Sequence, residues 1–292
     1  MFKGLFTALI TPFKNGQIDT DVFVRLIEFQ IDAGVDGLVV CGTTGESAVM
    51  TSKEYEQTVE LCIKTVNKRV PVIVGTGSND TQKTIANTCF AEKAGADGAL
   101  IVTPYYNKPT QEGLFLHYRA VHDASKLPII LYNVPGRTGV NISPETVGRL
   151  AHLTRIAAIK DATPDLMRPL RLRAAVEKKD FSILSGEDAS IVAFLAHGGD
   201  GCISVTSNVA PALCVELHRA WAKKDWDRIA YLRDLLLPLH DAMFVESNPA
   251  PVKYAAAQLG FGDGSLRLPL CEISEKSKEV VLSALRVAGV LK

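Results

Sequence analysis

Eight short apolar runs mark the chain from its N-terminus to about residue 224, and each is followed by a longer amphipathic stretch. This alternation is the pattern of repeated strand and helix units. The runs recur roughly every 20 to 33 residues, which matches the unit length of a (β/α)₈ barrel. They are "GLFTALI" (4–10), "GLVVCG" (37–42), "PVIVG" (71–75), "GALIVT" (98–103), "PIILYN" (128–133), "IAAIK" (156–160), "FSILS" (181–185) and "GCISV" (201–205).

The stretches between the runs have the period and the end signals of helices. In "DTDVFVRLIEFQIDAG", Asp19 or Thr20 can cap the helix, the apolar residues follow a spacing of three to four, and Gly34 ends it. We therefore predict a (β/α)₈ TIM barrel over residues 1–224. The structural alternative is a doubly wound open sheet. It is disfavoured because "GTGSND" lacks the last glycine of a dinucleotide fingerprint and no P-loop motif is present.

The strand pattern stops before residue 225, and helical periodicity continues to the end of the chain. We predict that residues 225–292 form a small all-helical appendage to the barrel. Within it, "ESNPAPVKYAAAQLG" indicates a proline-rich turn and then a helix that ends at Gly260. Such an appendage can cover the barrel, pack on its flank or mediate assembly.

Charge and composition favour a small-molecule partner. The 292 residues are 47% hydrophobic and carry 32 basic and 32 acidic side chains. This balance leaves no basic stripe for nucleic acid and no polybasic segment for a membrane surface. The chain shows neither a signal peptide nor an apolar run of the roughly 20 residues that a membrane span needs. We expect a soluble cytoplasmic protein.

The cysteines and histidines give no sign of a metal site. Six cysteines are scattered without a CxxC pair, which favours reduced cytosolic thiols over disulfides or zinc. The six histidines have no Cys, Ser or carboxylate at a telling spacing, so packing or solvent exposure explains them best. We expect no metal and no cofactor.

Lys160 ends the sixth apolar run, in "RIAAIKDATPD". The apolar residues 156–159 indicate a buried strand, and Asp161, Thr163 and Pro164 indicate that it stops. Desolvation disfavours the charged form of a buried amine, and a neutral amine can attack a carbonyl carbon. The alternative is a lysine that extends to solvent or pairs with Asp161.

Other chemically useful residues also follow predicted strands. Thr43 and Thr44 lie in "CGTTGES", where hydroxyls and glycine N–H groups can hold a small anion, although a helix cap in a tight turn is an alternative. In "YNVPGRTG", Tyr132 can relay protons and Arg137 can bind a carboxylate, unless they are a packed aromatic ring and a solvated arginine. In a barrel these strand ends gather at one face. The set as a whole predicts a Schiff-base enzyme: an amine for a ketone, hydroxyl relays for protons, and positive or N–H groups for carboxylates.

The chain resembles a known family along essentially its whole length, including the helical tail. The motifs that resemble the 4-hydroxy-tetrahydrodipicolinate (dihydrodipicolinate) synthase family are "CGTTGES", "TPYYNKPTQEG", "YNVPGRTG", "IKDAT", "LSGEDAS", "GCISVTSNVAP" and "ESNPAPVKYA". The resemblance implies that pyruvate, bound to a lysine as a Schiff base, adds to aspartate semialdehyde. This is the committed step toward lysine and diaminopimelate.

The resemblance also implies roles for individual residues. Lys160 would form the Schiff base, and Tyr132, Thr43 and Tyr106 would form a proton relay, with Tyr106 coming from the neighbouring subunit of a tight dimer. Thr44 would hold the pyruvate carboxylate, Arg137 the semialdehyde carboxylate, and Gly186 and Ile203 would line the site through their backbones. The family implies a homotetramer, built as a dimer of dimers.

Two rival functions remain at this point. Related lyases act on N-acetylneuraminate or 2-keto-3-deoxy sugar acids with the same lysine, but they usually carry Ser-Thr in place of Thr43 and Thr44 and an apolar residue in place of Arg137. The second rival is a catalytically silent barrel that serves as a binding module. The chain departs from the synthases at Asp161 and Pro164, where they more often have Glu and Gly, which affects the loop shape more than the reaction class.

The resemblance extends to an allosteric site for lysine, with changes. Lysine-inhibited relatives use two histidines after "GTTGES" that read Ser52 and Tyr55 here. Their acidic residue reads Lys83, whose like charge disfavours a lysine ligand. We therefore expect feedback inhibition by lysine to be weak or absent. The alternative is that the Lys83 side chain turns into solvent and leaves a weak lysine site. The positions that match the relatives are Ser47, Ala48, Asn79 and Tyr105.

Overall fold

The computed structural model describes residues 2–291. Within this range, eight parallel strands form a closed barrel in the order β1-β10-β9-β8-β7-β6-β5-β4. The predicted (β/α)₈ fold is confirmed, and the ends of each predicted strand differ from the observed ends by at most two residues. The barrel strands are β1 Gly4–Ala8, β4 Gly37–Val40, β5 Val72–Gly75, β6 Gly98–Val102, β7 Ile129–Asn133, β8 Ile156–Asp161, β9 Ser182–Ser185 and β10 Gly201–Ser204.

Helices alternate with these strands, and after β10 the described part of the chain contains helices and no further strand. The helices are α1 Thr20–Ala33, α2 Ser52–Val66, α3 Thr81–Ala94, α4 Gln111–Ala124, α5 Pro135–Thr138, α6 Pro144–Ala151, α7 Arg168–Ala175, α8 Ile191–Ala196, α9 Pro211–Lys223, α10 Trp226–Ala242, α11 Ala250–Gln258 and α12 Glu275–Val287, with 3₁₀ turns η1 Ser47–Val49 and η2 Thr206–Asn208. Helices α10 to α12 form the helical C-terminal region that the sequence predicts.

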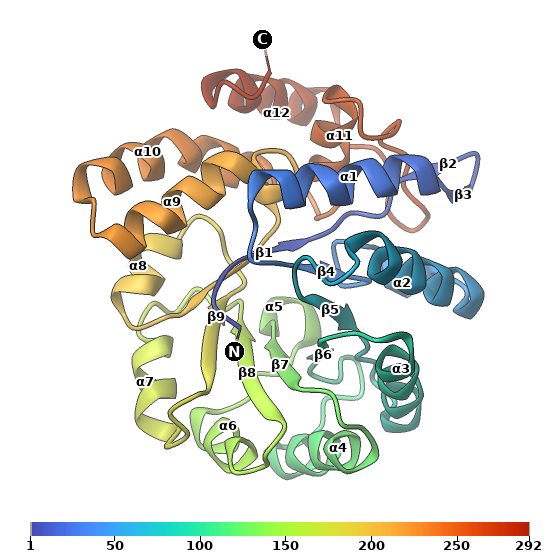
Figure 1. Ribbon diagram of the computed structural model, residues 1–292, viewed down its shortest axis with the longest axis vertical. Coiled ribbons are helices and arrows are strands. Elements are labelled where there is room, and N and C mark those ends of the chain that lie inside the picture. Colours follow the sequence, from blue (N-terminus) through green and yellow to red (C-terminus); the bar gives the residue numbers. More distant parts are fainter. Residues whose placement is uncertain (1, 292) are drawn as a thin grey trace. The chain divides into compact units, whose positions relative to one another are not determined.

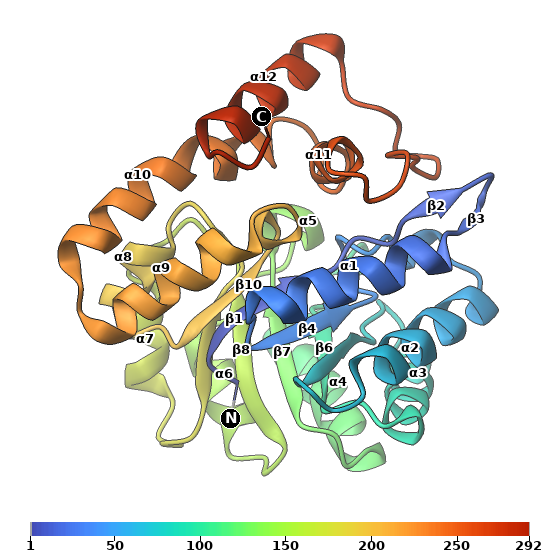
Figure 2. The same cartoon turned by 45° about the horizontal axis from the view of Figure 1, so that its top comes forward.

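The residues group into two compact units. The first comprises the N-terminus up to Gly4 together with Pro71–Ile203, and the second comprises Leu5–Val70 together with the chain from Ser204 onward. In the first unit, α3, α4, α6 and α7 follow one another around strands β6 to β9 (Figure 1). In the second, α12 packs on both α10 and α11 (Figure 2).

Burial explains why the apolar runs become strands of this kind. All six residues of β8 are buried, and β7 is buried throughout as well. Strands of a parallel sheet are covered on both faces, so they read as continuous apolar runs. Parallel strands also place all their carboxyl ends at the same side of the sheet, and the loops after them are where a barrel carries its chemistry.

The start of the second unit shows one confirmed helix signal and one missed hairpin. Asp19 caps α1 by accepting a hydrogen bond from the Val22 N–H at 3.1 Å, and Gly34 ends the helix with φ of 85°. The small hairpin of β2 (Phe13–Lys14) and β3 (Gln17–Ile18) was not predicted from the sequence. Its turn is Asn15-Gly16, with both residues at positive φ, and Asn-Gly is a strong signal for such a turn.

His117 on α4 is packed inside the first unit. The residue is 6% exposed, its Nδ1 lies 2.9 Å from the Thr81 hydroxyl, and its Nε2 has no hydrogen-bond partner within residues 2–291. Burial lowers the pKa of this imidazole from 6.5 to about 4, against a smaller opposing effect of Asp80. The folded protein therefore holds His117 neutral over a range in which the unfolded chain holds it charged.

We expect His117 to make the protein sensitive to acid. The free energy of unfolding should fall between pH 6.5 and pH 4, because the unfolded chain binds a proton on His117 that the folded chain does not. The loss reaches about 3 kcal/mol at pH 4. Urea unfolding across this range should show a shallower pH dependence for His117→Gln than for the unaltered protein. The exposed His152→Gln is the control, and equal slopes for all three proteins would contradict the prediction.

Candidate active site

Lys160 lies inside the first unit with its side chain away from solvent. It is the fifth residue of β8 and is 6% exposed. Among the described residues, no carboxylate lies within ion-pair distance of its amine, and the neighbouring Asp161 pairs with Arg168 instead. The sequence left open whether Lys160 extends to solvent or pairs with Asp161, and the structure shows neither. An amine in this setting is suited to nucleophilic attack on a carbonyl carbon.

Tyr132 is the closest aromatic neighbour of this amine. The register of β7 and β8 pairs Tyr132 with Lys160, and the lysine Nζ lies 4.5 Å from the centre of the tyrosine ring. Tyr132 is 7% exposed, so both side chains are held in one buried place. A phenol beside the amine can give and accept protons as bonds to the nitrogen and its substrate form and break.

Gly186 leaves room for the lysine side chain. It follows β9, and its N–H donates to the Asp161 carbonyl at 2.8 Å. A Cβ at this position would lie 2.9 Å from Lys160 Cε and 2.6 Å from Ala162 Cβ, both closer than such atoms approach. The structure thus brings three of the predicted residues together: Lys160, Tyr132 and Gly186. Ile203, another predicted lining residue, lies on β10 and is 1% exposed.

Arg137 and Tyr106 lie in loops that follow strands of the same unit, and both side chains are exposed. Arg137 is on α5, the short helix after β7, so its guanidinium can meet a dissolved anion. Tyr106 follows β6, is 88% exposed and has a backbone φ of 69°. An aromatic residue in the left-handed region is unusual, and here a tight turn surrounds it, closed by the Asn107 N–H, which donates to the Tyr105 carbonyl at 2.8 Å.

Thr43 and Thr44 follow β4 in the second unit. The turn is closed by the Glu46 N–H, which donates to the Thr43 carbonyl at 3.1 Å. Thr43 is exposed, whereas Thr44 is 3% exposed and its hydroxyl oxygen accepts a hydrogen bond from Asn248 Nδ2 at 3.0 Å. Because the oxygen accepts from Asn248, the hydroxyl proton of Thr44 remains available to donate to an anion.

A buried ion pair supports this threonine turn within the second unit. Lys253 Nζ on α11 lies 2.5 Å from Glu46 Oε1, with side-chain exposures of 2% and 1%. Glu46 has a φ of 54°, and the Lys253 amine also lies 4.1 Å from the centre of the Phe13 ring. Burial lowers the pKa of Lys253, and Glu46 opposes that shift. The pair therefore joins the C-terminal helices to the residues just after Thr44.

Comparison with known proteins identifies the family. A sequence model of the dihydrodipicolinate synthetase family matches residues 1–288. The chain belongs to this family. It is 54% identical to the 4-hydroxy-tetrahydrodipicolinate synthase of Rhodospirillum centenum over 291 residues, which cover 100% of both chains. The resemblance found in the motifs is thereby confirmed.

Solved structures of the family share the fold along the whole chain. The dihydrodipicolinate synthase of Thermotoga maritima is 45% identical, with a TM-score of 0.97 and 100% of each chain covered. The chloride-inhibited enzyme of Acinetobacter baumannii, in complex with pyruvate, is 42% identical, with a TM-score of 0.96 and 100% of each chain covered.

Three residues beside the threonine turn were not predicted from the sequence to belong to the site. Glu46, Asn248 and Lys253 all lie in quoted motifs, "CGTTGES" and "ESNPAPVKYA", but no role was predicted for them. One signal was present: a single lysine within the apolar stretch "PAPVKYAAA" is a candidate for a buried, paired charge. Its partner Glu46 is 207 residues away in sequence, and no local pattern connects the two.

The predicted allosteric positions are found in both units. In the first unit, Asn79 precedes α3, its carbonyl accepts from Asn107 Nδ2 at 2.9 Å, and Tyr105 is 38% exposed. Lys83 is exposed on the first turn of α3. In the second unit, Ser47 and Ala48 form η1 directly after Glu46.

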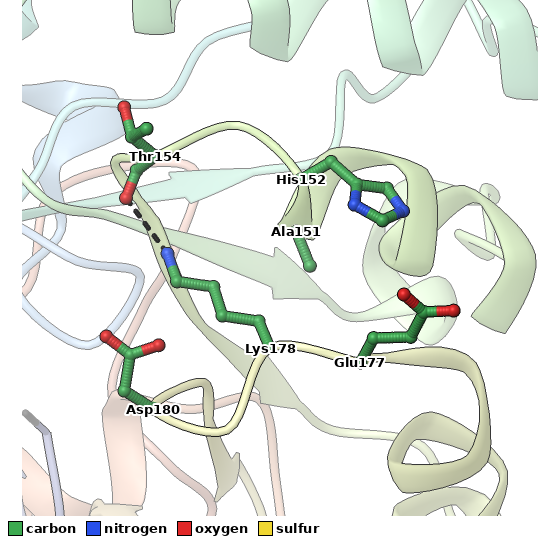
Figure 3. Close-up of a pocket in the computed structure, with 6 residues that line it drawn as sticks. All are labelled: Ala151, His152, Thr154, Glu177, Lys178 and Asp180. Carbon is green, nitrogen blue, oxygen red and sulfur yellow. Dashed lines mark hydrogen bonds between the residues drawn. The ribbon is translucent and has the colours of Figure 1, made fainter.

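A shallow hollow of about 420 Å³ lies elsewhere in the first unit, among the loops that precede β8 and β9. Lys178 reaches across it and donates to the carbonyls of Thr154 and Ile156, at 2.9 and 3.0 Å (Figure 3). This amine is therefore engaged with the backbone, and the hollow is at the amino ends of the strands, away from Lys160. We do not assign the chemistry to it.

Two further observations concern metals and membranes. No group of three or more His, Cys, Asp or Glu side chains within residues 2–291 is arranged to hold a metal ion. None of the helices in the described part of the chain is long and apolar enough to cross a membrane.

We expect Lys253→Met to destabilise the protein strongly, because it leaves the Glu46 carboxylate buried without its partner. Breaking one side of a buried ion pair costs about 3–5 kcal/mol. The double variant Glu46→Gln with Lys253→Met removes both charges and should recover much of that loss. Urea unfolding at pH 7 measures all three proteins. The exposed pair Arg233–Asp234 supplies the control, since Arg233→Met should change stability little. An equally small effect of Lys253→Met would contradict the prediction.

Proposed function

We propose that this chain condenses pyruvate with L-aspartate 4-semialdehyde to give 4-hydroxy-tetrahydrodipicolinate, the first committed step toward lysine and diaminopimelate. The observation that carries the proposal is the 54% identity to a synthase of that name along 100% of both chains. The buried Lys160 amine, with no carboxylate partner in the described chain, supplies the group that a lyase of the Schiff-base class requires.

The reaction runs through the Lys160 nitrogen. The neutral amine attacks the ketone carbon of pyruvate, and uptake of one proton with loss of water gives a protonated imine that carries one positive charge. Removal of a proton from the pyruvate methyl group turns the imine into an enamine. The enamine carbon forms a bond to the aldehyde carbon of the semialdehyde, the aldehyde oxygen takes up a proton and becomes a hydroxyl, and the imine to Lys160 forms again. The semialdehyde amine then attacks the imine carbon, and the bond from that carbon to the Lys160 nitrogen breaks, which closes the ring and releases the lysine as a free amine. No metal or organic cofactor takes part in these steps.

Several residues would move protons and hold the carboxylates. We assign proton transfer to Tyr132, whose ring centre lies 4.5 Å from Lys160 Nζ, and to Thr43 and Tyr106 on the basis of their motifs. Thr44 would donate to the pyruvate carboxylate, since its oxygen already accepts from Asn248. The remaining assignments are Arg137 for the semialdehyde carboxylate and the backbones of Gly186 and Ile203 for the site lining.

The assembly forms part of the proposal. A tyrosine ring that is 88% exposed in one chain is well suited to enter a neighbouring copy, which is the role that the family implies for Tyr106. We propose a homotetramer, built as a dimer of dimers, that acts in the cytoplasm. Its partners are the two small substrates, without nucleic acid or membrane.

Trapping with pyruvate and borohydride tests whether Lys160 is the nucleophile. Reduction of the imine should add the pyruvate carbons permanently to Lys160, and peptide mapping by mass spectrometry should find them there. Lys160→Ala should take up no label and should not consume semialdehyde in a coupled assay with pyruvate. Lys253 serves as an internal control, because its amine is buried against Glu46. Label on Lys253 or Lys3 with Lys160 unmodified would reject the assignment.

The response of the enzyme to L-lysine tests the allosteric position at which Lys83 stands in place of an acidic residue. We expect L-lysine at sub-millimolar concentration to leave the activity nearly unchanged, because the ligand ammonium would meet the like charge of Lys83. Lys83→Glu should introduce measurable inhibition, and Lys93→Glu, at an exposed position on the last turn of the same helix, should not. Strong inhibition of the unaltered enzyme would show that Lys83 does not prevent binding.

A further inference from the structure

Asp161 directly follows the proposed nucleophile and has a fully occupied carboxylate. Its side chain is 1% exposed. Oδ2 accepts from Arg168 Nε at 2.9 Å and from Asn133 Nδ2 at 3.0 Å. Oδ1 accepts from the N–H and the hydroxyl of Thr163, at 3.1 and 2.6 Å. A carboxylate offers about four acceptor positions, so Asp161 has none left for a substrate proton.

Arg168 and Asn133 connect this carboxylate to the segment between β7 and α6. The Arg168 guanidinium, 6% exposed, also donates to the Ile142 carbonyl. Asn133 Oδ1 accepts from the Ile142 N–H at 3.1 Å, and its Nδ2 also lies 2.9 Å from Asn141 Oδ1. We call Asn133, Asp161 and Arg168 the Asp161 cluster. It joins the ends of two strands to the start of α7, and all three residues are buried.

Two members of the Asp161 cluster directly follow proposed active-site residues in the sequence: Asn133 follows Tyr132, and Asp161 follows Lys160. The strand register pairs Tyr132 with Lys160 and then Asn133 with Asp161. Successive side chains of a strand point to opposite faces, so Tyr132 and Lys160 share one face and the cluster holds the other. Two backbone bonds close the same place, from Ala162 N–H to the Asn133 carbonyl at 2.9 Å and from Gly186 N–H to the Asp161 carbonyl at 2.8 Å.

We propose that Asp161 is a positioning residue for Lys160 and Tyr132. Its ion pair with Arg168 and its bond to Asn133 hold the ends of β8 and β7 in one register, and thereby keep the Lys160 amine over the Tyr132 ring. The inference rests on the proposed function, since it assigns a role within the Schiff-base reaction. Misplacing a reacting group by about 1 Å can cost on the order of a hundredfold in rate.

The test uses variants that separate positioning from stability. Asp161→Asn keeps the shape and removes the charge that Arg168 faces, and we expect kcat and the rate of pyruvate trapping to fall about ten- to a hundredfold. The double variant Asp161→Asn with Arg168→Met removes both buried charges, so its urea midpoint should return toward that of the unaltered protein. Its kcat should stay low, because the strand ends are still not held.

A neighbouring ion pair in the same loop gives the matched control. Asp165 and Arg171 lie 2.5 Å apart, and both are well exposed. Asp165→Asn removes a carboxylate four residues further along and should leave kcat and the trapping rate unchanged. All variants are compared by circular dichroism at the assay temperature, so that only folded protein is scored.

The outcomes distinguish the two proposals. If pyruvate and borohydride fail to label Lys160 in the unaltered protein, the proposed function fails, and the positioning role fails with it. If the unaltered protein is labelled and Asp161→Asn reacts equally fast, the proposed function stands and the positioning role is wrong. If kcat of the double variant recovers together with its stability, the cluster acts on folding alone, and the positioning role is again overturned.

Discussion

The register between β7 and β8 is the constraint on which the lysine part of the site depends. It places Tyr132 opposite Lys160 and Asn133 opposite Asp161. Because side chains alternate along a strand, a slip of one residue would exchange the two faces and put Asp161 where the amine now lies. Lys160 needs a place without a carboxylate to remain a nucleophile, whereas Asp161 needs four donors. One register satisfies both requirements, and the shifted register satisfies neither.

Each unit contains a buried ion pair next to a residue to which we assign chemistry. Asp161–Arg168 follows Lys160 by one residue, and Glu46–Lys253 follows Thr44 by two. A buried pair contributes little net stability, because desolvation of both charges offsets their attraction, but removal of one partner is costly. Such a pair therefore specifies one arrangement of the backbone more than it strengthens the fold. That property suits positions beside groups that must be held within a fraction of an ångström.

The sequence predicted what local periodicity encodes. The eight apolar runs located the barrel strands, and residues such as Asp19 and Gly34 marked a helix correctly, because capping and burial depend on neighbours in the chain. The partners of the buried charges were not predictable, since Glu46 and Lys253 are 207 residues apart. The domain boundary at residue 224 stays a prediction. So do the roles of all the predicted site residues, which are Lys160, Tyr132, Gly186, Thr43, Thr44, Arg137, Tyr106 and Ile203.

Asp161 and Pro164, where the resemblance to the synthases leads us to expect Glu and Gly, act on the same loop. The Asp161 carboxylate accepts from the N–H two residues later at 3.1 Å, which forms a turn that a short acidic side chain makes readily and a glutamate, one methylene longer, does not. Pro164 disfavours the helical region for Thr163, and a turn closed by the Arg168 N–H, which donates to the Asp165 carbonyl at 3.0 Å, then leads into α7. The single carboxylate of Asp161 therefore both ends β8 and accepts a hydrogen bond from Arg168. The shape of this loop and the position of the Lys160 amine are set by the same residue.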